Sequence, residues 1–304
     1  MTSPRRARGA RPRGRDAAAY LFLTPALVLF ALFTAVPIGY TAYLSLRRTK
    51  VTGLGLGRGS RTEVFAGLAN YADAVRDGAL WAGFGRVLGY GALVLAVMLG
   101  LALVFALTLD SAQVRLARFS RIAIFLPYAV PGVVATLLWG FLYLPSLTPL
   151  RGLNIDLALL GPRLVTFSMA NIAVWGGTGF NMLVLYTALR AVPRTYYEAA
   201  RIDGAGELQI ALRIKIPILT PAIILTTVFS LIATVQVFTE PTALRPLTNT
   251  ISSTWSPLMK VYRDAFVTGD LYGAAATSVL IAGVSLALSF GFLRVVRDRA
   301  FREG

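Results

Sequence analysis

One stretch decides the fold of this chain: Tyr197-Glu198-Ala199-Ala200-Arg201-Ile202-Asp203-Gly204-Ala205-Gly206, closing at Ile214-Lys215-Ile216-Pro217. It is a polar, charged segment between two long apolar runs. Thr195 followed three residues later by Glu198 fits a capping box, and Gly204 fits a left-handed helix end. The sequence therefore predicts a two-turn helix over residues 196–203, with small alanines that let another protein approach closely.

The composition around this segment is that of a membrane protein. The chain is 56% hydrophobic and only 14% charged, whereas soluble domains carry about 25% charged residues. It has no Cys and no His, which excludes disulfides, Cys or His metal sites, thiol nucleophiles and histidine acid-base catalysis. We predict no catalytic residue, no metal and no cofactor. Nucleic acid is one explanation of the net charge of +16, but basic membrane flanks explain it without such a partner.

The apolar runs predict an all-α membrane protein with six transmembrane helices. Each run has the roughly 20 residues that cross about 30 Å of hydrocarbon, and helices satisfy their own backbone at that depth. Before them, residues 1–16 form a basic tail that we expect to be disordered at the cytoplasmic surface. The remainder, 17–304, is the predicted transmembrane domain, with helices at about 17–46, 84–109, 121–144, 166–190, 217–240 and 272–294.

Counting Lys and Arg predicts the orientation. With both termini in the cytoplasm, the inner segments hold 18 of the 30 basic residues, and six of those 18 belong to the tail. Arg47, Arg48 and Lys50 follow the first helix on the predicted outer side, against the rule that basic residues favour the cytoplasmic side. The positive-inside signal therefore depends on the tail. An even number of helices places both termini and the segment around Glu198 on one side.

The segment around Glu198 resembles the EAA loop of binding-protein-dependent ABC importer permeases. That family's pattern is E-A-A, three residues, G, nine residues and I-x-L-P; here Glu198-Ala199-Ala200, Gly204 and Ile214 keep the spacing, and Ile216 replaces the leucine. Other stretches are typical of the carbohydrate-uptake branch (maltose, glycerol-phosphate and multiple-sugar type): Phe65 to Tyr71, Val192-Pro193, Leu126-Pro127 with Pro131-Gly132, Trp175 to Asn181, and Gln236-Val237-Phe238.

The resemblance implies a type I ABC importer permease fold, with a cytoplasmic coupling helix between helices 4 and 5. It also implies an inner-membrane permease subunit that carries a carbohydrate. The implied partners are a second homologous permease, two ATPase subunits, a soluble substrate-binding protein and membrane lipid, but no nucleic acid. The residues implied in ATPase coupling are Glu198, Ala199, Ala200, Asp203, Gly204, Ile214 and Pro217. From the residues alone, Glu198 equally serves as a helix cap.

The chain carries no G-x-x-x-x-G-K-[ST] motif. We therefore expect ATP hydrolysis on separate subunits, so that this chain is not itself an enzyme. Gly176, Gly177 and Gly179 lie inside an apolar span and favour close helix packing over a phosphate loop.

Polar residues at membrane depth are the candidates for the translocation path. They suit an uncharged, hydroxyl-rich solute, and interhelical hydrogen bonding is the alternative role for each. Glu240, near the outer end, is expected to be a loop contact. Pro127 and Pro131 either hinge the third helix or are tolerated kinks. The predicted path residues are Trp175, Asn181, Tyr186, Thr234 and Gln236.

Other functions stay open at this stage. A glycerol-phosphate or polyamine importer of the same class shares the loop motif, because the motif reports the ATPase contact and not the cargo. An ion-coupled secondary transporter requires buried carboxylates and usually inverted repeats, and neither is evident. An intramembrane enzyme lacks obvious catalytic residues.

Overall fold

The computed structural model describes residues 14–51, 61–111, 116–149, 152 and 157–300. Most of these residues are helical, and two strands form one hairpin. The longer helices are α1 (Gly14–Phe30), α2 (Val36–Ser45), α4 (Gly78–Leu109), α7 (Val165–Arg190), α10 (Ile216–Val235) and α13 (Leu271–Ala300). The shorter ones are α3 (Ala69–Arg76), α5 (Ala117–Phe125), α6 (Gly132–Leu142), α8 (Thr195–Ile202), α9 (Glu207–Ile210), α11 (Thr239–Leu244) and α12 (Pro257–Phe266).

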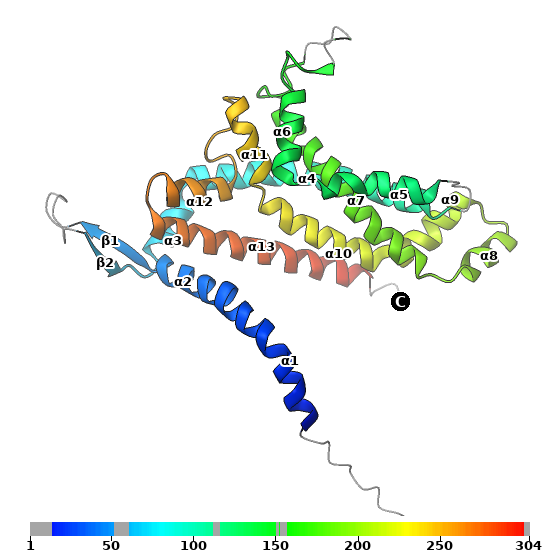
Figure 1. Ribbon diagram of the computed structural model, residues 1–304, viewed down its shortest axis with the longest axis horizontal. Coiled ribbons are helices and arrows are strands. Elements are labelled where there is room, and N and C mark those ends of the chain that lie inside the picture. Colours follow the sequence, from blue (N-terminus) through cyan, green and yellow to red (C-terminus); the bar gives the residue numbers. More distant parts are fainter. Residues whose placement is uncertain (1–13, 52–60, 112–115, 150–151, 153–156, 301–304) are drawn as a thin grey trace, which may run out of the picture.

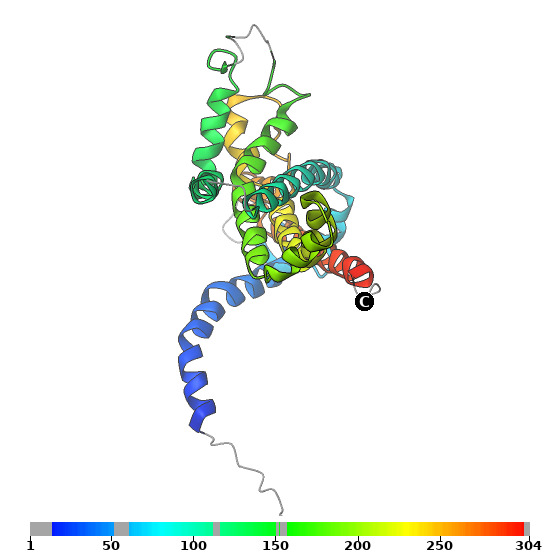
Figure 2. The same ribbon diagram turned by 90° about the vertical axis from the view of Figure 1, so that its right-hand side faces the viewer.

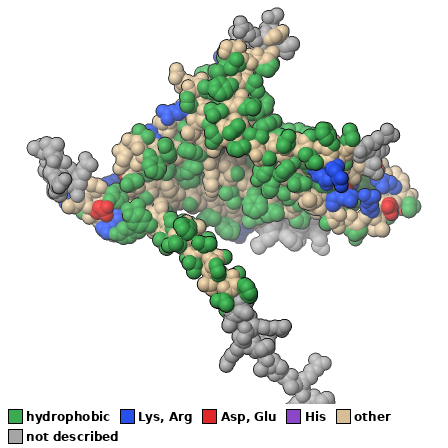
Figure 3. All heavy atoms as spheres, in the orientation of Figure 1, with side chains coloured by type: hydrophobic (Ala, Val, Ile, Leu, Met, Phe, Trp, Pro, Cys, Tyr) green, Lys and Arg blue, Asp and Glu red, His purple; other side chains and the backbone are tan. Residues whose placement is uncertain are grey.

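Four of the long helices form an elongated bundle (Figure 1). Within it α4 packs against α7 and α10, and α13 packs against α10, α12 and the base of α2. Small Ala102 and Ala106 on α4 are fully buried in a cluster with Met182 and Leu185 of α7, which is how apolar helices approach closely in a membrane. Hydrophobic side chains cover most of the visible surface (Figure 3). Within the described residues, five helices are long and apolar enough to cross a membrane, or six when a bent pair counts as one span.

The first predicted span stands away from this bundle. It curves outward from α2 to its end at α1 (Figures 1 and 2), and its apolar stretch has no buried residue between Tyr20 and Leu44. The described helix includes residues 14–16 of the tail predicted over 1–16, and the rest of that tail, residues 1–13, lies outside the described part of the chain.

Two π-helical turns occur among the described residues, and each directly precedes a helix that has a proline in its first turn. They are η1 (Ala31–Ala35), before Val36-Pro37, and η4 (Ala211–Lys215), before Ile216-Pro217. The amide of Val36 bonds to the carbonyl of Ala31, and that of Ile216 bonds to Ala211, five residues back. Because proline lacks an amide and its ring crowds the preceding turn, the wider turn lets the helix continue without a break.

The third predicted span, 121–144, is broken rather than continuous. The segments Ala117–Ala129 and Gly132–Leu142 meet at 94°, and the first of them ends in the short 3-10 turn η2 (Leu126–Ala129). Val130 is extended at ψ 128°, the conformation favoured directly before a proline. The structure therefore has a sharp bend at Pro127 and Pro131, which fits both roles left open for these prolines, a hinge and a tolerated kink. Beyond it α6 leaves the bundle and packs against α11 (Figure 1).

The other predicted spans are confirmed as helices with shifted ends. The span predicted at 166–190 is α7, and those predicted at 84–109 and 272–294 are longer in the structure. The span predicted at 217–240 is wrong at its end, because α10 stops at Val235 and Gln236 caps it. The chain then turns into α11 and η5 (Arg245–Leu247).

A hairpin at the α12 end of the bundle was not predicted. Strands β1 (Arg47–Val51) and β2 (Arg61–Phe65) pair antiparallel, with Arg47 opposite Phe65. Close to it, the buried Lys260 ammonium bonds to Asp264 and lies 2.8 Å from Asp77. Burial opposes the charged forms, but these hydrogen bonds outweigh it, lowering the pKa of Asp77 and raising the pKa of Lys260. The cluster fixes α12 against the start of α4.

Candidate functional site

The helix predicted over 196–203 is α8, one residue earlier than expected. The predicted capping box is absent, because Arg194 occupies the N-cap and no side chain bonds to the first-turn amides. Thr195 lies in the first turn instead. Because Thr195 is not the N-cap, Glu198 does not complete a capping box. The Glu198 side chain is exposed and makes no cap bond in the described structure.

The predicted left-handed end of α8 is confirmed. Gly204 has φ +83°, a conformation that glycine adopts without a steric penalty. The amide of Gly204 bonds to the carbonyl of Arg201 at 3.0 Å, and that of Ala205 bonds to Ala200 at 2.9 Å. This pair of bonds is a Schellman motif, which satisfies the final carbonyls and turns the chain sharply back.

The turn between α8 and α9 presents apolar side chains to the outside. Ile202 is 87% exposed and Leu208 is 74% exposed, and Tyr196 and Leu212 are also exposed. Glu198, Ala199, Asp203 and Gly204 are exposed on the same segment, whereas Ala200 is half-buried. We call residues 195–212 the coupling segment. Exposed apolar side chains among charged ones are the composition of a protein-contact surface.

Beneath the coupling segment lies a buried ion pair. The Lys215 ammonium is 2.6 Å from an Asp110 carboxylate oxygen, and the side chains are 6% and 7% exposed. The same ammonium lies 4.9 Å from the centre of the Tyr197 ring. Burial, and then the nearby Asp110 carboxylate, raise the pKa of Tyr197. Lys215 therefore connects the end of α4, the helix α8 and the start of α10.

This ion pair lines a cavity of about 440 Å³, which we call the coupling cavity. Its wall is strongly charged, since Glu198, Arg190, Arg194 and Arg201 line it together with Asp110 and Lys215. Of the other residues predicted for coupling, Ile214 lies half-buried in η4, and Pro217 is exposed in the first turn of α10.

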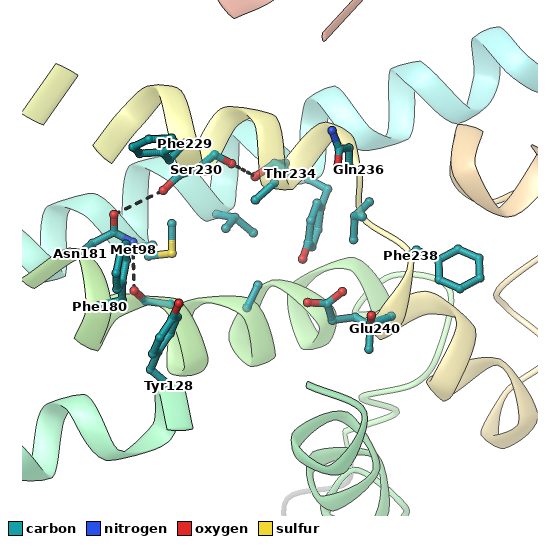
Figure 4. Close-up of a pocket in the computed structure, with 17 residues that line it drawn as sticks. Met98, Tyr128, Phe180, Asn181, Phe229, Ser230, Thr234, Gln236, Phe238 and Glu240 are labelled. Carbon is teal, nitrogen blue, oxygen red and sulfur yellow. Dashed lines mark hydrogen bonds between the residues drawn. The ribbon is translucent and has the colours of Figure 1, made fainter. Parts of the chain in front are cut away.

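A second cavity, of about 420 Å³, lies between α4, α7 and α10 and is bounded by η2 and the start of α11 (Figure 4). We call it the central cavity. Three predicted path residues line it: Asn181, Thr234 and Gln236. The Asn181 amide donates to the carbonyl of Gly177 at 2.9 Å, and Ser230 donates to the Asn181 oxygen at 3.4 Å. Thr234 donates to the carbonyl of Ser230 at 2.8 Å.

Aromatic rings stand at the edge of this cavity. Tyr128 stacks on Phe180 with ring centroids 5.0 Å apart, and Phe229 faces them from α10 (Figure 4). Both Tyr128 and Phe229 are more than 45% exposed. The bend of the third span places Tyr128 here, and Gly179 permits it, because a Cβ there would overlap the carbonyl oxygen of Ile124.

The other two predicted path residues lie elsewhere. Trp175 packs edge-on against Trp139, with ring centroids 5.9 Å apart, and is not among the residues that line the central cavity. Tyr186 lies five residues after Asn181 on α7, lines the coupling cavity and has the Arg121 guanidinium over its ring at 5.2 Å. The structure therefore brings together three of the five.

Sequence reasoning missed several residues of these cavities. Ser230 lies one helical turn before Thr234, so the four-residue spacing was a usable signal. Asp110 is a lone acid directly after an apolar run, and nothing in the sequence connects it with Lys215. Glu240 lines the central cavity. Within the described residues, no group of three His, Cys, Asp or Glu side chains is placed to hold a metal ion.

Comparisons with known proteins give a consistent result. Residues 98–302 match the protein family described as the binding-protein-dependent transport system inner membrane component. The sn-glycerol-3-phosphate transport system permease protein UgpA of Salmonella typhimurium is 29% identical over 92% of this chain and 94% of its own length. The corresponding protein of Agrobacterium fabrum is also 29% identical, with the same coverage.

Two solved structures of bacterial alginate ABC transporters have the same fold. One, in complex with an alginate pentasaccharide-bound periplasmic protein, superposes with a TM-score of 0.80 at 19% identity, over 95% of this chain and 96% of the other. The second, described as importing the acidic polysaccharide alginate, gives 0.75 at 18% identity over 94% and 96%.

Proposed function

This chain belongs to the binding-protein-dependent transport system inner membrane components, and we propose that it is the permease subunit that carries a sugar or glycerol-phosphate in an ATP-driven importer. The cargo arrives on a soluble binding protein and crosses between this chain and a second permease. ATP is bound and hydrolysed by separate subunits. The observation that carries the proposal is the coupling segment, whose motif spacing and exposed face fit a docking element for another protein.

The coupling segment is suited to receive force. Glu198 and Asp203 offer free carboxylates to a partner's Arg or backbone amides, and the exposed Ile202 offers an apolar contact between them. Ala199 and Ala200 allow close approach, and the Gly204 turn fixes the angle at which α8 is presented. Lys215 then links movement of α8 to α4 and α10. Closure of the ATPases would shift these helices by favouring one arrangement of them.

The central cavity is the proposed cargo path. Asn181, Thr234 and Gln236 provide hydrogen-bonding groups for hydroxyls at membrane depth, and the aromatic rim provides flat apolar surface. That rim is exposed in the isolated chain, which fits a pathway completed by a second permease. The unburied α1–α2 helix supplies further apolar surface for that subunit and for lipid.

The proposed placement is the bacterial-type inner membrane, with both termini and the coupling segment in the cytoplasm. The hairpin and α12 then face the binding protein. The family is one of transport components, and the carbohydrate branch of the sequence resemblance favours a sugar. An sn-glycerol-phosphate cargo is favoured instead by the names of the relatives at 29% identity.

Replacement of Glu198 tests the coupling role. In proteoliposomes that contain this chain, its second permease, the ATPases and the binding protein, we expect Glu198→Ala to lower cargo-stimulated ATP hydrolysis and uptake at least 10-fold. The matched control is Glu207→Ala, an acid on the same segment that pairs with Arg201 at 2.8 Å. Because that exposed pair contributes little, uptake by the control should stay within 2-fold of wild type.

Membrane insertion and subunit recovery must be equal for both variants, as measured by co-purification. Full uptake by the Glu198→Ala complex would refute the coupling role of this carboxylate. A membrane potential that drives uptake without ATP would instead favour a secondary transporter.

A further inference from the structure

Glu240 gives the central cavity an electrostatic bias. Seventeen residues line the cavity, and they include neither Lys nor Arg. Glu240 is the only one of them with a carboxyl group. The remaining polar groups are amides and hydroxyls. Ionisation of Glu240 therefore gives the cavity wall of this chain a negative charge that no lining Lys or Arg offsets.

The Glu240 carboxylate faces the cavity without a counter-charge from this chain. It lies in the first turn of α11, directly after the chain leaves α10, and its side chain extends toward the cavity (Figure 4). No ion pair involving it is found among the described residues, whereas the buried carboxylates of Asp110 and Asp264 each have a lysine partner. Unlike those two, the carboxylate is free to act on a solute.

An unpaired carboxylate discriminates between solutes by charge. Two like charges about 6 Å apart in a site of effective dielectric about 20 disfavour each other by about 100-fold in affinity. A neutral hydroxyl, by contrast, donates a charge-assisted hydrogen bond to the same oxygens. The amides and hydroxyls of Asn181, Ser230, Thr234 and Gln236 add partners for further hydroxyls.

We propose that Glu240 is a specificity-determining residue that selects neutral, hydroxyl-rich solutes and rejects phosphorylated or carboxylated ones. The inference rests on the proposed function, in which the central cavity carries cargo. It decides between the two cargo classes named there, in favour of an uncharged sugar or polyol.

Matched pairs of solutes test the selection. The complete complex is purified without its binding protein, so that the binding protein's own preference does not enter. Equilibrium dialysis then measures trehalose against trehalose 6-phosphate, and glycerol against sn-glycerol 3-phosphate. In wild type, we expect the neutral member of at least one pair to bind about 100-fold more tightly than its phosphate ester.

The isosteric variant Glu240→Gln keeps the shape and hydrogen-bonding capacity of the side chain. It should reduce that ratio at least 10-fold, chiefly by tightening binding of the phosphate ester. Glu63→Gln removes one charge from the β2 strand, outside the cavity lining, and should leave the ratio unchanged. A merely structural role of Glu240 in the first turn of α11 would weaken both members of a pair equally, and so would not change the ratio.

The other outcomes are also decisive. An unchanged ratio in Glu240→Gln would overturn the role of this residue. Equal or tighter binding of the phosphate esters to wild type would overturn the cargo class, and would point to a cation contributed by the second permease. Failure of all four solutes to bind would count against the central cavity as a sugar path, and therefore against the proposed function itself.

Discussion

The coupling cavity and the central cavity have nearly the same volume, about 440 and 420 Å³, but opposite chemistry. Four basic and two acidic side chains line the first, whereas a single carboxylate is the only charged group lining the second. A surface that holds another protein benefits from fixed charges paired at defined positions. A path that must release its cargo benefits from weak, neutral hydrogen bonds. On the proposed function, this difference corresponds to transmission of movement at the coupling cavity and passage of solute through the central cavity.

The polar side chains of the two cavities are also paired differently. In the coupling cavity, Asp110 and Lys215 neutralise each other and join two helices. In the central cavity, Asn181, Ser230 and Thr234 bond to one another and to helix carbonyls. Breaking the ion pair should therefore affect stability more than any neutral substitution in the path.

The largest effect is expected at the ion pair. Lys215→Met leaves the Asp110 carboxylate buried without a partner, which typically destabilises a protein by about 3–5 kcal/mol. The double variant Asp110→Leu/Lys215→Met removes both charges and should recover most of that loss. Thermal unfolding of the purified complex measures both. A single variant as stable as wild type would show that the pair does not hold this end of the molecule together.

Near the central cavity, the next largest effect is expected where two helix backbones lie too close for an added side chain. At Gly179 a Cβ would overlap the Ile124 carbonyl oxygen and lie 2.7 Å from the Phe125 Cα. Gly179→Ala should therefore destabilise the fold by about 1–3 kcal/mol through overpacking, and displace Tyr128 from the cavity rim.

Gly176→Ala is the matched control, because a Cβ there meets nothing within 4 Å. Thermal unfolding and uptake should both distinguish the two variants. Equal stability of the two would mean that α5 moves away from α7 at little cost.

The smallest effect is expected at the turn of the coupling segment. Gly204→Ala places a side chain at φ +83°, which costs about 1 kcal/mol even though no atom lies within 4 Å of the new Cβ. Gly206→Ala, at φ −73° with equally open space, should be neutral. Because the turn orients α8, the ATP hydrolysed per solute transported should rise for Gly204→Ala alone. An equal ratio in both variants would show that the turn geometry is unimportant for coupling.

The sequence predicted different features of the two cavities. The helix α8 and its glycine end followed from local spacing, since a Schellman motif involves only a few neighbouring residues. The capping box was wrong because Thr195 had already entered the helix. Asp110 and Lys215 lie 105 residues apart, and no local pattern connects them.

In the central cavity, the polar residues were visible as exceptions in apolar helices, but their directions were not. Tyr186 and Asn181 both lie on α7, yet five residues of separation place them in different cavities. Trp175 was expected at the path and packs on Trp139 instead. For Pro127 and Pro131, the sequence left a hinge and a tolerated kink open, and it did not indicate that the bend there brings Tyr128 to the cavity.

The sequence by itself determined the membrane class, most of the helical segments and the helix-turn geometry of the proposed coupling segment, because hydropathy, helix length and turn chemistry act over short distances. Only the tertiary structure decided which side chains share a cavity. Helix rotation, the bend of the third span and the end of α10 at Val235 place Glu240, Asn181 and Thr234 in the lining of one cavity, and Lys215 against Asp110 in another. Each of these depends on packing between helices that are distant in the chain, and packing is what sets the direction of a side chain.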